Sequence, residues 1–239
     1  MGWLVPKIWQ GGDVWILGGG PSVPKLFGIP KEIIDKVHSG ELPESSYSPY
    51  MKFLHDKHVI GINVAYRIGD WIDMIFFGDT GFFRQHKQYL ANWKGLKVSC
   101  APQKEKIDDW VKIVDRDTKK PRGISSNPCA VSWNKNSGAA AISLAVHTGA
   151  KRIFLLGFDM RYDETHEQHW HSVYKRNIVE SKKNKSPFHQ HLIGFTQIAR
   201  DAGKLGVQIY NVSPNSAITT LPKITLEEAI ELSSNKTLK

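Results

Sequence analysis

The sequence predicts an α/β protein built on a single Rossmann-like, doubly wound and mostly parallel sheet. Short apolar runs alternate along the chain with amphipathic stretches, as strands alternate with helices in such folds. The apolar run Val14–Leu17 ends in three glycines followed by Pro21 and Ser22, which is typical of a strand-to-helix turn. The run Ile153–Met160 is strongly apolar and ends in Gly, Phe, Asp and Met, as expected of a buried central strand and the turn after it.

The N-terminal half follows this alternation up to a polar segment. Apolar runs predict four strands, at Val14–Leu17, Val59–Asn63, Met74–Phe77 and Lys97–Cys100. Helices are predicted at Lys31–Val37 and Arg84–Trp93. We expect Gly40–Tyr50, with its Pro and Ser residues, to form a loop, and Ile107–Pro128 to be irregular and to lie on the surface.

The C-terminal half continues the pattern around a long polar insertion. Ser137–Thr148 is predicted to be a helix whose alanine face packs closely on the sheet, with Gly149 as its stop. Two further strands are predicted at Ile153–Gly157 and Val207–Val212. A helix follows each of them along the chain, at His191–Leu205 and Thr225–Ser233. In the last helix, Thr225 and Glu228 are spaced as a capping box. Residues 161–188 are polar and long for a simple connection, which predicts a His-rich lid. No linker divides the chain, so we expect one α/β nucleotide-binding domain, residues 1–239.

Composition narrows the class of protein. No apolar stretch reaches the roughly 18 residues that a membrane span needs, and the N-terminus does not resemble a signal peptide. Cys100 and Cys129 have neither metal-type spacing nor a disulfide framework, which favours a reducing, cytoplasmic location. The net charge of +9 attracts nucleotides or a nucleic-acid acceptor, although a solvated basic face would also explain it. Eight tryptophans leave room for an aromatic interface in a homo-oligomer.

The glycine loop, Gly18–Gly19–Gly20–Pro21–Ser22, is the first candidate binding site. Backbone N–H groups at the start of the helix after such a loop can hold a phosphate. The loop lacks the third glycine of the dinucleotide fingerprint and the Lys-Ser/Thr ending of a P-loop, so neither NAD binding nor P-loop chemistry is predicted. The alternative is a tight turn that binds nothing.

Polar residues at other strand ends form the second candidate site. Asn136–Ser137–Gly138 opens a helix, where Ser137 can cap the first turn and Gly138 allows a ligand to approach closely. Asn63 and the pair Gly78–Asp79 follow two further strands, and the carboxyl ends of parallel strands meet at one edge of the sheet. Asp79 could accept a hydrogen bond from a base or ribose. The alternative is that these residues only cap helices and turns.

Histidines form the third cluster, and they are His166, His169, His171, His189 and His191. His169 and His171 would lie on one side of an extended chain. With Asp159 or Asp163 they could hold a divalent metal. The alternative is a set of exposed side chains in a hydrophilic lid. Imidazole is also suited to act as a general base near neutral pH.

In order along the chain, these segments resemble those of the bacterial sialyltransferases of the Campylobacter lipooligosaccharide type. The resemblance lies in Gly18–Ser22, Asn63, Asn136–Gly138, Leu156–Asp159 and Ser213–Ser216. The segments are also similar to those of the wider DUF115 group, which includes archaeal 6-hydroxymethylpterin diphosphokinases and many phage proteins. The His-Trp-His element looks most like the phage branch, which would place the protein in the cytoplasm of a host cell.

The resemblance implies a glycosyltransferase-A-like fold of the sialyltransferase type, with a nucleotide-sugar donor lying across the strand ends. A histidine after the lid is the general base in these enzymes, and His189 matches its spacing whereas His191 does not. In place of lid tyrosines that bind the leaving phosphate, this chain has Arg161 followed by Tyr162. Arginine can bind a phosphate bidentately, so Arg161 is the second predicted catalytic residue. The predicted nucleotide site comprises Gly18, Gly19, Gly20, Pro21, Ser22, Asn63, Gly78, Asp79, Asn136, Ser137, Gly138, Asp159 and Tyr162.

Three functions stay open at this point. The first is a nucleotide-sugar glycosyltransferase in which His189 deprotonates an acceptor hydroxyl, without a required metal. The second is an ATP-dependent diphosphokinase acting on a small alcohol such as a hydroxymethylpterin, with Mg²⁺ or another divalent ion held by Asp79, Asp159 or Asp163. The third is a non-catalytic module that binds a nucleotide or nucleic acid.

Overall fold

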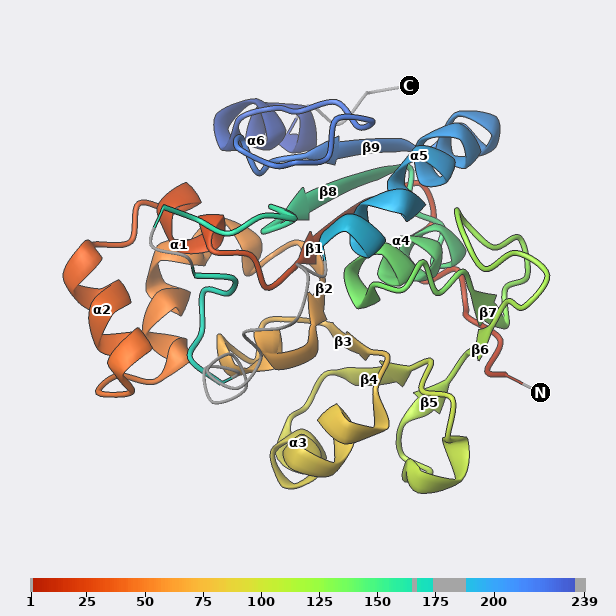
Figure 1. Cartoon of the computed structure of the whole chain (residues 1–239), viewed down its shortest axis with the longest axis horizontal. Coiled ribbons are helices and arrows are strands. Elements are labelled where there is room, and N and C mark those ends of the chain that lie inside the picture. Colours follow the sequence, from red (N-terminus) through yellow and green to blue (C-terminus); the bar gives the residue numbers. More distant parts are fainter. Residues whose placement is uncertain (1, 165–166, 174–187, 235–239) are drawn as a thin grey trace.

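The computed structural model describes residues 2–164, 167–173 and 188–234. Its main sheet has seven strands in the order β5-β4-β3-β2-β1-β8-β9, and every pairing between them is parallel (Figure 1). The strands are β1 (Asp13–Leu17), β2 (His58–Ile62), β3 (Met74–Phe77), β4 (Leu96–Ser99), β5 (Lys112–Ile113), β8 (Arg152–Leu156) and β9 (Gln208–Asn211). The predicted doubly wound parallel sheet is therefore confirmed.

Helices cover both faces of the sheet, as a parallel sheet requires. The helices are α1 (Ser22–Leu26), α2 (Lys31–Ser39), α3 (Thr80–Asn92), α4 (Ser137–His147), α5 (Phe188–Leu205) and α6 (Leu226–Ser234). α4 and α5 pack on one face, against the side chains of Ile16, Ile60 and Leu155. The other helices pack on the opposite face, against Trp15 and Phe154 among others. This division explains why the central strands are apolar on both sides.

The chain order creates a switch point between β1 and β8. From β1 the chain builds outward through β2, β3, β4 and β5, then returns through α4 to lay β8 on the other side of β1. The connections after β1 and β8 therefore diverge to opposite sides of the sheet. In open α/β sheets, ligands bind at such a point, outside the carboxyl ends of the strands.

Two sequence predictions fail in the first half of the chain. Gly40–Tyr50 was expected to be a loop, but the 3-10 helix η1 (Glu44–Leu54) occupies most of it and buries Tyr47, Met51 and Leu54. Burial of these apolar side chains outweighs the local effect of Pro and Ser. The segment Ile107–Pro128 is also not purely superficial, because it contains β5 and β6 (Asp115–Arg116) and buries Val114. β6 pairs in parallel with β7 (Ala130–Val131) to form a small second sheet.

The predicted lid, residues 161–188, stays a prediction. Residues 165–166 and 174–187, which include His166, lie outside the described part of the chain. In the described part, no helix is both long and apolar enough to cross a membrane.

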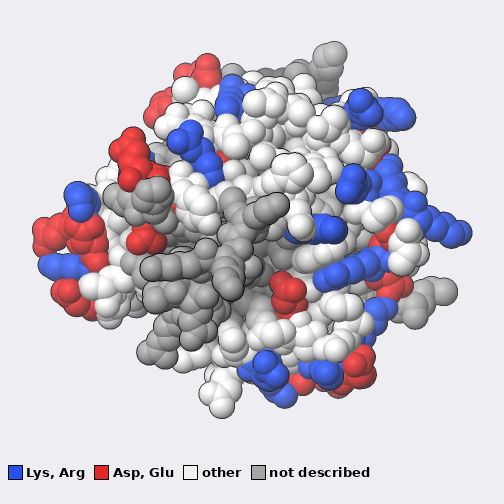
Figure 2. All heavy atoms as spheres, in the orientation of Figure 1, with Lys and Arg blue, Asp and Glu red and all other residues white. Residues whose placement is uncertain are grey.

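Charge is unevenly distributed on the face shown in Figure 2. Lys and Arg side chains gather on the right-hand side of this view, where β6 and β7 lie in Figure 1. The left-hand side carries Asp and Glu as well as Lys. On this face, positive side chains are thus most prominent beside the small sheet, with some Asp and Glu among them.

Candidate functional site

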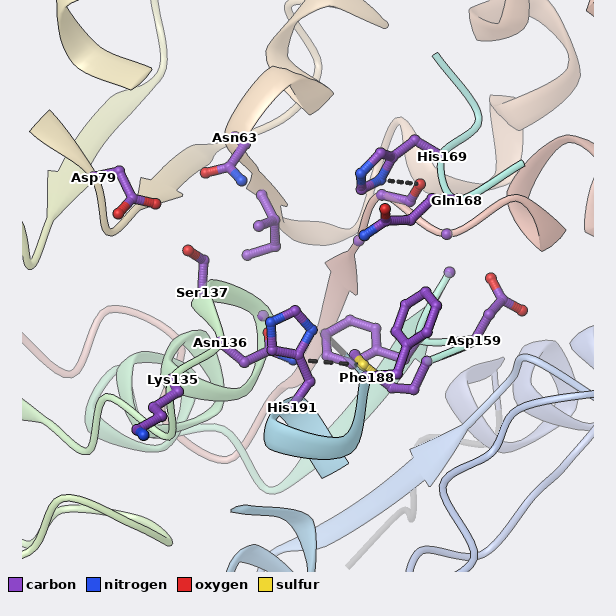
Figure 3. Close-up of a pocket in the computed structure, with 18 of the residues that line it drawn as sticks. Asn63, Asp79, Lys135, Asn136, Ser137, Asp159, Gln168, His169, Phe188 and His191 are labelled. Atoms are coloured by element: carbon purple, nitrogen blue, oxygen red, sulfur yellow. Dashed lines mark hydrogen bonds between the residues drawn. The ribbon is translucent and has the colours of Figure 1, made fainter. Parts of the chain in front are cut away.

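A cavity of about 430 Å³ lies at the switch point of the sheet. Residues that follow β1, β2, β3 and β8 all contribute to its wall, together with the first residues of α3, α4 and α5 (Figure 3). The polar residues of the wall are Asn63, Asp79, Gln85, Lys135, Asn136, Ser137, Asp159, Arg161, Gln168, His169, His171 and His191. Strand ends far apart in the sequence therefore meet in one site, as the strand pattern predicts.

The N-terminus of α4 opens into this cavity. The side chain of Asn136 caps the helix by accepting a hydrogen bond from the backbone N–H of Ala139 at 3.2 Å. Ser137 and Gly138 also line the cavity, and their N–H groups have no partner inside the helix because they belong to its first turn. These groups carry the positive end of the helix dipole, which favours an anion. Asn136, not Ser137, is thus the cap.

Two glycines near α4 are required by packing. A Cβ atom on Gly138 would lie 2.9 Å from the Phe158 ring, and one on Gly78 would lie 2.2 Å from the Trp133 ring. Gly138 was expected to let a ligand approach closely; it lines the cavity, and its lack of a side chain also makes room for Phe158. Gly78 does not line the cavity, and its carbonyl accepts a hydrogen bond from Arg116 at 2.7 Å.

Backbone strain is concentrated around the cavity. Apart from glycines, four described residues have a left-handed backbone, with φ of +53° at Asn63, +52° at Asn134, +54° at Lys135 and +51° at Met160. Asn63, Lys135 and Met160 line the cavity, and Asn134 precedes Lys135. Such conformations cost energy and occur preferentially at functional sites. In addition, Oδ1 of Asn63 is buried and has no hydrogen-bond partner among the described residues, which is unusual for a buried polar atom.

The glycine loop lines the cavity, but its helix terminus is already occupied. Gly18, Gly19 and Gly20 belong to the wall, whereas Pro21 and Ser22 do not. Oδ2 of Asp159 accepts hydrogen bonds from the backbone N–H of Ser22 at 3.2 Å and from its hydroxyl at 3.0 Å. The carboxylate therefore stands where a phosphate was expected, at the start of α1. Burial raises the pKa of Asp159, although the hydrogen bonds from Ser22 oppose this shift.

Trp170 attaches residues 167–173 to the glycine loop. Its indole Nε1 donates to the carbonyl of Gly18 at 2.8 Å, and its backbone N–H donates to the carbonyl of Gly19 at 3.1 Å. Its own carbonyl lies 3.0 Å from Nε2 of His38 and accepts from the hydroxyl of Tyr47 at 3.4 Å. The Trp170 side chain is fully buried. These contacts hold Gln168, His169 and His171 against the cavity.

His169 and His171 do lie on one side of the chain, as predicted. Their rings stack with centroids 5.0 Å apart and an angle of 7° between planes. Burial lowers the pKa of His169, and it lowers the pKa of His171 well below its ordinary value of 6.5, so both rings are neutral near pH 7. Within the described residues, no group of three or more His, Cys, Asp or Glu side chains could hold a metal ion. The structure gives the predicted metal site no support.

The two histidines at the start of α5 differ in position. His191 lines the cavity, and its ring points into it in Figure 3. His189 is exposed and is not part of the cavity wall. Burial lowers the pKa of His191 from its ordinary value of 6.5. The resemblance selected His189 by its spacing, but the geometry brings His191 to the site.

The remaining predicted residues lie at the rim. Arg161 lines the cavity and is exposed, whereas Tyr162 lies outside the wall and packs edge-on against Phe188 at 5.0 Å between ring centroids. Asp79 is exposed, lines the cavity and precedes the first residue of α3. In Figure 3, Asp79, Asn63 and Ser137 lie on one side and His169 and Gln168 on the other.

The sequence also contains an Asp-x-Asp pattern, Asp115–Arg116–Asp117, which in other proteins can hold a divalent metal. Both carboxylates are bonded to the protein. Asp115 pairs with Lys104 and accepts from the backbone N–H of Gly2 at 2.9 Å. Asp117 accepts from the hydroxyl of Ser125 at 2.6 Å and from two backbone N–H groups. The pair therefore does not form a free cation site.

No protein-family model matches the sequence, and no curated protein matches it. Several solved structures share its fold. The sialyltransferase CstII from Campylobacter jejuni, in complex with the substrate analogue cytidine-5'-monophosphate, aligns with a TM-score of 0.50 and 15% identity, over 90% of this chain and 86% of that chain. The MAf glycosyltransferase from Magnetospirillum magneticum AMB-1 aligns with a TM-score of 0.54 and 11% identity, over 90% of this chain but 34% of the other. The chain thus spans about a third of the MAf protein. At these identities the likeness shows the fold, and the chain has the α/β fold of two glycosyltransferases.

Proposed function

We propose that this protein is a glycosyltransferase that moves a sugar from a nucleotide donor to an acceptor hydroxyl. The observation that carries the proposal is that His191 and the N-terminus of α4 line the same cavity at the switch point. The first can accept a proton and the second can hold a phosphate. The fold is shared with CstII, which was solved with cytidine-5'-monophosphate, so this nucleotide is the first ligand to test.

The donor phosphate would bind at Ser137 and Gly138. Both residues line the cavity and belong to the first turn of α4, whose N–H groups have no partner within the helix, and the N-terminus of α3 lies at the same wall. The start of α1 is a poorer site, because the Asp159 carboxylate already occupies it and would repel a phosphate. The unpartnered Oδ1 of Asn63 would accept a hydrogen bond from the donor. Arg161 at the rim would stabilise the departing phosphate.

His191 would act as the general base. An acceptor oxygen forms the new bond to the anomeric carbon while the bond from that carbon to the phosphate oxygen breaks, and the acceptor proton moves to an imidazole nitrogen. A neutral ring is needed for this step, and burial keeps His191 neutral near pH 7. His189, the base selected by the resemblance, lies two residues away and about 200° around the helix. A substitution of His189 is therefore the matched control for a substitution of His191.

The proposed phosphate site can be tested with thermal shifts. CMP, UDP, GDP and their sugars would each be added to the protein, since a ligand that binds the folded state raises the Tm. In the Ser137→Asp variant, the new carboxylate suits the helix start but repels a phosphate, so the nucleotide-induced shift should disappear. Ser137→Ala keeps the backbone N–H groups and should keep the shift.

Three results would oppose the proposal. If no nucleotide or nucleotide sugar raises the Tm of the wild-type chain, the donor site does not exist. If Ser137→Asp responds like the wild type, the phosphate does not bind at α4. Stabilisation that requires ATP together with Mg²⁺ would favour the diphosphokinase function instead.

A further inference from the structure

A second cavity, of about 810 Å³, lies beside the first along the same edge of the sheet. Its wall includes Cys100 and Ala101, which follow β4, and the β6 residues Asp115 and Arg116, which follow β5. Loop residues 117–120 and 126–127 make up most of the rest of the cavity wall. Both cavities therefore open at carboxyl ends of the parallel strands, where ligands of such sheets bind.

Arg116 and Trp133 form a wall between the two cavities. Arg116 lines the second cavity and Trp133 lines the first. The guanidinium carbon of Arg116 lies 3.8 Å from the centroid of a Trp133 ring. Nε of Arg116 donates to the carbonyl of Cys100 at 2.8 Å, and Nη2 donates to the carbonyl of Gly78 at 2.7 Å. A group held in the second cavity thus lies next to the proposed donor site.

The second cavity has an excess of positive charge. It is lined by Lys104, Arg116, Lys119 and Lys120, against Asp115 and Asp117. Lys104 is paired with Asp115, and Lys120 lies 2.9 Å from Asp201. Hydrogen bonds from Ser125 and two backbone N–H groups lower the pKa of Asp117 in spite of its burial, which raises it. The two carboxylates are therefore already bonded to groups of the protein.

Arg116 and Lys119 are the two cations of this wall that remain, against the one unpaired carboxylate, Asp117, which keeps its negative charge. Neither makes an ion pair with a carboxylate in residues 2–164, 167–173 and 188–234. Arg116 is half-buried and fixed by two carbonyls and an aromatic ring, none of which cancels its charge. Figure 2 shows that positive side chains gather on this side of the molecule.

We infer that the second cavity binds a phosphate or carboxylate group of an anionic saccharide, and that this saccharide is the acceptor. Rigid guanidinium groups suit such anions, because their charge and N–H donors are held in place before binding. The volume exceeds what a single anion needs and leaves room for a sugar attached to it. Assignment of the saccharide as acceptor rests on the function proposed above, whereas anion binding in the cavity does not.

The test measures binding of glucose 6-phosphate, glucuronic acid and glucose by calorimetry. We expect the two charged sugars to bind and glucose not to bind, with affinity falling as salt is added. The two charged sugars distinguish phosphate from carboxylate recognition. Lys119→Glu, at an exposed loop position, should weaken binding of the charged sugars by about tenfold, because it reverses a charge at the rim.

Lys94→Glu is the matched control. Lys94 is exposed and precedes β4, so it lies at the amino ends of the strands, whereas the second cavity opens at their carboxyl ends. Lys94→Glu changes the net charge equally, and binding should persist. Equal binding of glucose, or unchanged binding in Lys119→Glu, would overturn the inference. The same holds if a single-stranded oligonucleotide binds in a Lys119-dependent way and the charged sugars do not. The Tm increase caused by CMP should be the same in Lys119→Glu as in the wild type. Calorimetry with the charged sugars therefore tests the second cavity, and the CMP-induced shift tests the donor site independently.

Discussion

The indole N–H of Trp170 donates a 2.8 Å hydrogen bond to the carbonyl of Gly18, across 152 residues of sequence. This bond joins residues 167–173 to the glycine loop after β1, at the wall of the cavity at the switch point. This hydrogen bond is buried, so removal of the indole N–H would leave the carbonyl of Gly18 without this donor. An unsatisfied buried carbonyl is destabilising.

Trp170→Phe should therefore destabilise the protein more than the same change at Trp15. Both tryptophans are fully buried, but Nε1 of Trp15 has no hydrogen-bond partner. The difference should be about 1–2 kcal/mol in the free energy of unfolding, measured by urea denaturation. Equal losses in the two variants would mean that the Trp170 bond adds nothing to stability.

His191→Gln should lower kcat about 10²–10⁴-fold in a transfer assay, which is the range for loss of a general base. His189→Gln should retain nearly full activity, because His189 is exposed outside the cavity. Nucleotide-induced thermal shifts would verify that both variants still bind the donor. The opposite pattern of activities would return the role of base to His189.

The rate of transfer should fall at low pH as His191 takes up a proton. Burial lowers the pKa of His191 below 6.5, so the midpoint of this fall should lie below 6.5. The profile of kcat/KM against pH measures it in the free enzyme. A midpoint above 6.5, or a rate that rises toward acid, would show that the base is another group.

His86 should make folding stability depend on pH. Burial lowers its pKa from 6.5 to about 4, and the Tyr66 hydroxyl lies 2.8 Å from Nδ1. Because the unfolded state binds the proton more tightly, the stabilisation is complete above pH 6.5 and is lost as the pH falls toward 4.

Between pH 7 and pH 4.5, the free energy of unfolding should fall less in His86→Gln than in the wild type, by on the order of 2 kcal/mol. Denaturation curves at pH 7 and pH 4.5 would measure the effect, since the variant has no imidazole to protonate. A slope as steep as that of the wild type would assign the acid sensitivity to other buried histidines.

Most of the fold follows from patterns within short segments. Continuous apolar runs marked the buried parallel strands, and the capping box of the last helix is present: the N–H of Thr225 donates to Glu228 at 2.8 Å, and the N–H of Glu228 donates to Thr225 at 3.2 Å. Gly149 ends its helix with φ of +94°, as its position predicts. The 3-10 helix η1 was missed because tertiary burial of Tyr47 overrode local sequence preferences.

The candidate site was predicted less completely, because its details depend on contacts between distant segments. Nothing near Ser22 in the sequence indicates that Asp159, 137 residues later, would occupy the start of α1. The direction of His191 depends on where α5 begins and how it packs, which spacing along the sequence does not determine. Strand-end residues such as Asn63 and Ser137 do line one cavity, because the topology of a parallel sheet brings the ends of its strands together.

The central position of β1 has a consequence for biosynthesis. Among the described strands β1 is translated first, yet its partner β8 follows far later: Asp13 pairs with Arg152, 139 residues away. Until then one edge of β1 is unpaired, and the sheet face that α4 and α5 will cover is bare. A nascent chain stalled before α4 would expose apolar surface and be prone to aggregate. The cavity at the switch point is completed only when α5, which supplies Phe188 and His191 to its wall, has been made.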